Sequence, residues 1–208
     1  MHGESYYVGA KEWLSGIDGH LTFLTTEAFV TEVIERALRL HRRSPIRLDL
    51  TNLPDVYPIK VPVRFDKRAA KKGSSALATE ITTANQNAIV ISNGVKDAPN
   101  TMSFQAMKGL NGMTEKDIFV IATHLSPDEY ARLNVLGQWL GKGGDVIRLH
   151  YEDQINQAVG RNRGFRQAAT STKTAVICSP RLWNNVMSKL DETGTSRTLL
   201  YPESSRLW

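Results

Sequence analysis

Short apolar runs of strand length alternate with segments of helical period along the 208-residue chain. Strands are predicted at residues 20–24, 46–50, 59–65, 88–92, 117–123, 145–150 and 174–179, with a last edge strand at 197–201. This alternation is typical of an α/β domain in which helices cover a largely parallel sheet.

Helix signals lie between these runs. Residues 27–40 carry apolar side chains three and four positions apart, which predicts a helix with one buried stripe. Ser126 followed by Pro127 combines a hydroxyl cap with proline in the first turn, so a helix is expected over residues 127–140. Ser179 and Pro180 repeat that signal and predict a helix to about residue 190.

The organisation that follows has three parts. Residues 1–44 form a lead-in segment with one strand and one helix, residues 45–201 form the layered domain, and residues 202–208 are a tail. A chain of this length buries roughly 70% of its unfolded surface on folding, which is enough for one substantial core.

Composition limits the chemistry. The net charge of +5 and the sequence pI near 9.4 favour acidic partners such as nucleic acid or nucleotides. The single cysteine, Cys178, lies in an apolar run and is expected to be a core residue of a protein in a reducing compartment. The five histidines are dispersed, so no zinc site is predicted.

No apolar run reaches the roughly 20 residues that a membrane-spanning helix needs. The first residues also lack the basic and then apolar pattern of a signal peptide. We therefore expect no membrane partner and a cytoplasmic protein, or a nuclear one if the source is eukaryotic.

Candidate chemistry is concentrated in two segments. Residues 151–167 read YEDQINQAVGRNRGFRQ and place several arginines at the start or along one side of a predicted helix. Arginine presents a planar fork of donors that fits phosphate oxygens, so this cluster favours contact with an anionic phosphate. The basic stretch at residues 64–72 is interpreted as a solvated helix face, with a track for nucleic acid as the alternative.

The second segment, residues 103–111, reads SFQAMKGLN and precedes an Asn-Gly turn and the apolar run 118–122. Together the two segments resemble motifs five and six of the second RecA-like motor domain of superfamily-two helicases and translocases. The fifth motif of that family reads approximately T-D-x-A-x-R-G-L-D and the sixth reads Q-x-x-G-R-x-G-R. The matching residues are Ser103, Ala106, Lys108, Gly109, Leu110 and Asn111 for the fifth motif, and Gln157, Gly160 and Arg161 for the sixth.

The chain departs from the family pattern at several positions. Gly164 stands where the second arginine of the sixth motif is usual, and arginines flank it at Arg163 and Arg166, so the second phosphate contact stays open between them. Lys108 and Asn111 replace the arginine and aspartate of the fifth motif. A superfamily-one reading, in which residues 108–110 are that group's Lys-Gly-Leu, is an alternative.

The resemblance implies a RecA-like three-layer sandwich with a mostly parallel sheet flanked by helices. It implies that Arg161 is an arginine finger acting on ATP, that Arg163 or Arg166 makes a second contact, and that Gln157 binds the phosphates or the attacking water. Gly160, Gly109 and Asn111 would lie at the nucleotide. Ser103, Lys108 and the Gly109 backbone would contact single- or double-stranded nucleic acid.

The chain lacks a phosphate loop of the form G-x-x-x-x-G-K-[ST]. The nearest string, GQWLGKGG at residues 137–144, has glycine after Lys142 where a magnesium-binding hydroxyl is needed. Under the resemblance, ATP with Mg²⁺ is bound mainly by a first RecA-like domain, in cis or in trans, and residues 1–44 include the end of that domain. The domain alone is then inactive as an NTP hydrolase. The alternative is a non-enzymatic α/β module that binds nucleic acid or protein.

Overall fold

The computed structural model describes residues 32–36, 39, 59–70, 72–95, 97–107, 110, 112–162, 172–190 and 198–203. Of the helix expected at residues 27–40, residues 32–36 and 39 are described and are helical. The strands expected at residues 20–24 and 46–50 lie outside the described residues.

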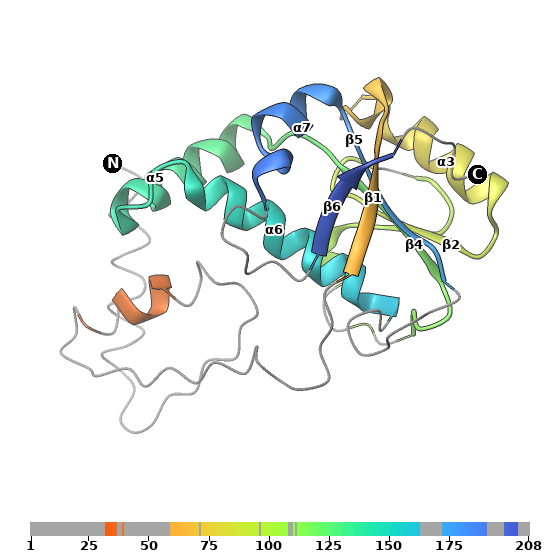
Figure 1. The fold of residues 1–208 in the computed structure, drawn as a ribbon, viewed down its shortest axis with the longest axis horizontal. Coiled ribbons are helices and arrows are strands. Elements are labelled where there is room, and N and C mark those ends of the chain that lie inside the picture. The colour runs from red at the N-terminus through yellow and green to blue at the C-terminus, as the bar shows by residue number, and fades with distance from the viewer. Residues whose placement is uncertain are drawn as a thin grey trace. The chain divides into compact units, whose positions relative to one another are not determined.

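A six-stranded, all-parallel sheet organises the described part of the chain (Figure 1). Its strand order is β3-β2-β4-β5-β1-β6. The strands are β1 (Ile59–Phe65), β2 (Ala88–Ile91), β3 (Thr101–Met102), β4 (Asp117–Ala122), β5 (Thr174–Cys178) and β6 (Thr198–Pro202). The predicted α/β class with helices flanking a parallel sheet is confirmed, and β6 is the expected edge strand. The short strand β3 was not predicted.

Strand β4 lies between β2 and β5, and all six of its residues are buried. Its Val120 is in register with Ile91 of β2 and Val176 of β5. A continuous apolar run is what a strand covered on both faces requires, because its side chains alternate between the two faces.

Helix α3 (Ser74–Ala84) covers one face of the sheet. It buries Leu77, Ala78 and Ile81; Ile81 follows Leu77 by four positions and Ala78 by three, so the three side chains share one side of the helix. They pack with alternate residues of the strands: Ala88, Val90, Phe119, Ile121, Ala175 and Ile177. The intervening strand residues are buried as well, so the second face of the sheet is also covered.

The remaining helical elements are α4 (Phe104–Met107), α5 (Pro127–Leu140), α6 (Asp145–Val159) and α7 (Pro180–Asn185), with 3-10 turns η1 (Lys67–Ala69), η2 (Gly160–Asn162) and η4 (Met187–Lys189). The helix predicted at residues 127–140 is confirmed, and Ser126 and Glu129 form a complete capping box at its start. The helix predicted from Ser179 begins as expected and gives way to the turn η4.

The strand predicted at residues 145–150 is wrong, because these residues form the first turns of α6. The short apolar run that contains Val146, Ile147 and Leu149 has the length and composition of a strand. Over the whole helix the buried positions continue to Tyr151, Ile155, Ala158 and Val159, with the three- and four-residue spacing of a helix.

The chain divides into two compact units, one of residues 1–51 with 126–153 and one of residues 52–125 with 154–208. Within the first unit, Lys142 Nζ pairs with Glu32 Oε1 at 3.0 Å, and the Arg36 guanidinium lies 4.9 Å from the centre of the Trp139 ring. The sheet belongs entirely to the second unit. The domain limits predicted at residues 44 and 201 stay a prediction.

Because the strands are parallel, all of their carboxyl ends lie along one side of the sheet, here called the carboxyl edge. All of their amino ends lie along the opposite side, here called the amino edge. The connection from β1 through α3 to β2 runs in one direction along the sheet, and the connection from β5 through α7 to β6 runs in the other. Since such crossovers are right-handed, α3 and α7 cover opposite faces, as Figure 1 shows. None of the described helices is long and apolar enough to cross a membrane.

Candidate functional site

Arg161 lies in the turn η2, directly after helix α6 and ahead of strand β5. The sequence predicted that the arginine cluster stands at the start of a helix or along one side of it. The structure places Arg161 past the helix carboxyl end instead, because α6 begins at Asp145. A cation at that position interacts favourably with the negative end of the helix dipole. The turn also brings Arg161 to the amino edge of the sheet, where β5 begins.

The two candidate segments meet at Arg161. Its Nη1 donates a hydrogen bond of 2.9 Å to the carbonyl oxygen of Leu110, which is 51 positions earlier in the chain. Leu110 belongs to the segment at residues 103–111. The pairing of the two segments, which sequence alone suggested through a family pattern, therefore has a direct contact in the fold.

Gln157 and Gly160 lie beside Arg161 in the chain. Gln157 is in the last turn of α6, four residues before Arg161. Gly160 is the first residue of the turn η2. Both residues are half-buried. The order glutamine, glycine, arginine thus occupies one helix end.

Ser103 lies at the opposite edge of the sheet, after the carboxyl end of β3. Its Oγ accepts a hydrogen bond from the backbone N–H of Ala106 at 3.0 Å, so the hydroxyl caps the single turn α4. Asn93, after the carboxyl end of β2, accepts from the N–H of Phe104 at 3.2 Å. Ser103 therefore lies at the carboxyl ends of the strands, whereas Leu110 contacts Arg161 near their amino ends.

Five of the predicted site residues lie outside the described residues: Lys108, Gly109, Asn111, Arg163 and Arg166. The choice between Arg163 and Arg166 as the second phosphate contact stays open.

Asn162 is a buried residue that sequence reasoning missed. Its Nδ2 donates to Thr172 Oγ1 at 3.0 Å and to Thr174 Oγ1 at 2.9 Å. The side chain therefore joins the turn that carries Arg161 to the first residue of β5 and to the residue two before it. The position of this asparagine directly after the Gly-Arg pair was the only local signal of its role. Its hydrogen-bond partners are ten and twelve positions later in the chain, so the local sequence does not indicate them.

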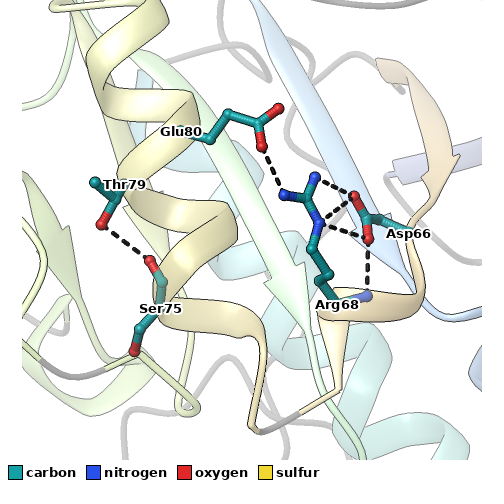
Figure 2. A network of polar contacts seen from close by, with 5 residues as sticks. All are labelled: Asp66, Arg68, Ser75, Thr79 and Glu80. Atoms are coloured by element: carbon teal, nitrogen blue, oxygen red, sulfur yellow. Dashed lines mark hydrogen bonds and ion pairs between the residues drawn. The ribbon is translucent and has the colours of Figure 1, made fainter.

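A polar network stands at the carboxyl edge, after β1 (Figure 2). Arg68 donates to Asp66 through Nε at 3.2 Å and Nη2 at 2.8 Å, and to Glu80 of α3 through Nη1 at 2.6 Å. These hydrogen bonds from Arg68 hold the pKa of Asp66 below its usual range, against the opposing effect of partial burial. The network fixes the loop that leaves β1 against α3.

The solvated basic face predicted at residues 64–72 is correct only in part. Arg64 is buried in β1 and pairs with Glu203 Oε2 at 3.2 Å, while Arg68 is neutralised by Asp66 and Glu80. Arg64 is buried because β1 is an inner strand of the sheet, between β5 and β6. Lys67 and Lys72 are exposed as predicted.

The sequence predicted no reactive cysteine and no phosphate loop in this chain. Cys178 is a core side chain buried in β5, and burial raises the pKa of its thiol to about 12. The string at residues 137–144 begins in helix α5 and its Lys142 is paired with a carboxylate, which is unlike the strand, loop and helix order of a phosphate loop. Among the described residues, no group of three His, Cys, Asp or Glu side chains is placed to hold a metal ion.

Comparison with models of known protein families, with curated proteins and with solved structures finds no match to this chain. The case for a function therefore depends on the two segments and on the contacts described above.

Proposed function

We propose that this chain is the second motor domain of an ATP-dependent nucleic-acid helicase or translocase. In this proposal Arg161 acts on ATP that is held with Mg²⁺ by a first RecA-like domain, in the same polypeptide or in a partner protein. The substrate is a single- or double-stranded nucleic acid, and the chain makes contacts to its backbone. The superfamily-one alternative assigns the same overall role.

The observation that carries the proposal is the hydrogen bond from Arg161 to Leu110. A chance likeness in two short segments gives no reason for them to touch in the fold. A contact across 51 positions is what a motor domain needs if nucleotide sensing at one segment is to be coupled to nucleic-acid contact at the other. Ser103 and Leu110 of this segment then lie at opposite ends of the strands.

The donor capacity of Arg161 also supports the proposal. A guanidinium has five N–H donors, and the bond to Leu110 uses one of them. Among the residues that the structure describes, no carboxylate forms an ion pair with Arg161. Its charge is thus available for a phosphate, and the Leu110 bond helps to orient the side chain. In related phosphoryl transfers an arginine finger contributes about 10³ to 10⁵ in rate.

The geometry around Lys142 supports the part of the proposal in which another domain binds ATP. A phosphate-loop lysine must reach the β- and γ-phosphates, but the Lys142 amine is paired with Glu32 at 3.0 Å and follows a helix. When ATP and Mg²⁺ are bound by a first domain, they supply the reacting phosphate and the metal that neutralises its charge. Arg161, Gln157 and Gly160 then contribute orientation and charge stabilisation.

The proposal is tested with the chain joined to, or mixed with, its first motor domain. Arg161→Ala is expected to reduce nucleic-acid-stimulated ATP hydrolysis by about 10³-fold or more while the domain stays folded. Arg161→Lys keeps the charge but loses the planar fork, so most of the loss should persist. Unchanged turnover in the alanine variant contradicts the motor proposal.

The isolated 208-residue chain gives a second test. It is expected to show no ATP hydrolysis and only weak, salt-sensitive binding to nucleic acid, because phosphate contacts release counterions. Robust hydrolysis by this chain alone contradicts the assignment of a half motor.

The second candidate is a non-enzymatic α/β module that binds nucleic acid or protein. One observation favours it: Arg161 already has two structural functions, as a cation at the end of α6 and as a donor to Leu110. In that case both arginine variants change stability and have no effect on ATP turnover by any partner.

A further inference from the structure

An exposed aromatic pair stands at the carboxyl edge of the sheet. Phe65 is the last residue of β1 and is 44% exposed, which is unusual for a ring at the end of an inner strand. Its ring meets Trp183 of α7 edge to face, with centroids 5.8 Å apart and an interplanar angle of 65°. The half-buried Trp183 thus supports one edge of the Phe65 ring and leaves part of that ring open.

The fold places this pair where ligands bind in open parallel sheets. The chain leaves β1 toward α3 and leaves the neighbouring β5 toward α7, and these two helices cover opposite faces. Adjacent strands whose connections diverge in this way form a topological switch point, and ligands of α/β proteins bind outside the carboxyl ends at such points. Phe65 ends one of the two strands, and Trp183 lies in the helix that follows the other.

Two cations lie close to the pair in the sequence. Lys67 follows Phe65 by two positions and Arg181 precedes Trp183 by two, and both are exposed. Within the described part of the chain, neither has a carboxylate in an ion pair. Burial lowers the pKa of His124, two residues after the end of β4, and the charge of Arg181 lowers it further.

Three carboxylates close to β1 are already paired with other arginines. Arg68 binds Asp66 and Glu80, and Arg64 binds Glu203. Lys67 and Arg181 are therefore the cations close to the open aromatic ring in the sequence that keep no carboxylate partner among the described residues. An apolar protein partner has no need of these two cations, whereas a ligand with both a flat ring and an anionic group matches all four side chains.

We propose that Phe65 and Trp183 form a stacking platform for one base of a single-stranded nucleic acid, and that Lys67 and Arg181 bind the adjoining phosphates. A duplex is excluded at this platform because its bases are already stacked on one another. The inference rests on the proposed function for the class of ligand, but it uses the opposite edge of the sheet from Arg161. In this inference the chain contacts a base of the nucleic acid as well as its sugar-phosphate backbone.

The test measures binding of fluorescently labelled 15-mers to the 208-residue chain by anisotropy at low salt. Three probes are compared: oligothymidylate, oligouridylate and an abasic strand of equal length and charge. Phe65→Ala is expected to weaken binding of the two base-bearing strands about tenfold, which is within the range for loss of one stacked base. Binding of the abasic strand should be unchanged. The ratio between the first two probes distinguishes a DNA from an RNA ligand.

Matched variants separate stacking from folding and from charge. Phe65→Trp keeps a flat ring and should retain binding, while Phe65→Leu keeps an apolar contact to Trp183 and should lose base-dependent binding. Tyr130→Ala removes a 52% exposed ring from α5 and should have no effect. Arg181→Ala should weaken binding of base-bearing and abasic strands equally and reduce the salt slope by about one.

The outcomes distinguish this inference from the proposed function. If the chain binds the strands but Phe65→Ala and Phe65→Leu bind as the parent does, the platform is overturned and the motor proposal stands. If no strand binds, or if abasic and base-bearing strands lose affinity equally in both variants, the platform is also overturned. If base-dependent binding is lost as expected while Arg161→Ala leaves turnover unchanged in the completed protein, the platform stands and the motor proposal falls.

Discussion

The guanidinium of Arg161 donates from Nη1 to the carbonyl oxygen of Leu110 at 2.9 Å and so joins two segments that are 51 positions apart. The bond is exposed and occupies one guanidinium donor, and among the described residues the other donors of Arg161 have no hydrogen-bond partner. A stability effect and a catalytic effect of this side chain should therefore differ greatly in size, which makes them separable.

Arg161→Ala is expected to lower the free energy of unfolding by only about 1 kcal/mol, the net value of one such hydrogen bond. Urea unfolding followed by circular dichroism measures this. Arg161→Lys keeps a donor and a cation at the helix end and should lose less. A loss of more than about 3 kcal/mol would show that Arg161 is mainly structural, and a loss of turnover would then have no bearing on catalysis.

Local sequence signals predicted the fold well. The capping box at Ser126 and Glu129 lies within four residues, and the six buried residues of β4 form one continuous run, so each element can be read without knowledge of its neighbours. Helix α6 was read wrongly at its start because Val146, Ile147 and Leu149 satisfy a strand pattern over six residues. The helical spacing is evident only over all fifteen.

The candidate site was less predictable because its contacts are long-range. A family pattern suggested that the segments of Ser103 and Arg161 belong together, but nothing in either segment indicates that Leu110 offers the carbonyl. The neutralisation of Arg64 and Arg68 likewise depends on Glu203 and Glu80, which lie 139 and 12 positions away. The ion-pair partners of a charged segment are therefore known only once the fold is known.

Asn162→Ala is expected to destabilise the domain by about 1 to 3 kcal/mol, because it removes two buried hydrogen bonds and leaves a gap beside the hydroxyls of Thr172 and Thr174. Urea unfolding again gives the value. Asn87→Ala is a matched control, since Asn87 also donates to a distant residue, at 2.8 Å to the Glu115 carbonyl, but is exposed. Equal losses in the two variants would contradict a special role for Asn162 at the base of β5.

Gly137→Ala is expected to destabilise the protein by more than about 1 kcal/mol, although alanine is the better helix former. A Cβ at Gly137 would collide with the carbonyl oxygen of Gly143, which folds back over the end of α5. Gly141→Ala tests a different cost, because its Cβ meets nothing within 4 Å but its φ is +73°.

Thermal unfolding should rank these glycine variants. Gly141→Ala should lose about 1 kcal/mol from backbone strain alone. Gly112→Ala, with open space and no positive φ, should be close to neutral. A Gly137→Ala variant as stable as Gly112→Ala would show that the Gly143 carbonyl does not lie against α5 in solution.

Acid titration tests the network at the carboxyl edge of the sheet. Hydrogen bonds from Arg68 lower the pKa of Asp66 in the folded state relative to about 3.9 in an unfolded chain. The unfolded state therefore binds the proton more readily, so the stabilisation by this pair is fully present above the unfolded pKa and is lost as the pH falls through the folded pKa. The stability difference between the parent and Asp66→Asn should be constant above about pH 5 and shrink below it.

The midpoint for Asp66 itself can be followed by carbon NMR of the side-chain carboxyl. Arg68→Ala should raise this midpoint toward the unfolded value, because the largest cause of its depression is removed. Lys67→Ala removes an exposed neighbour that makes no hydrogen bond to Asp66 and should leave the midpoint in place. A midpoint that is the same in the parent and in Arg68→Ala would mean that the fork between Arg68 and Asp66 does not form in solution.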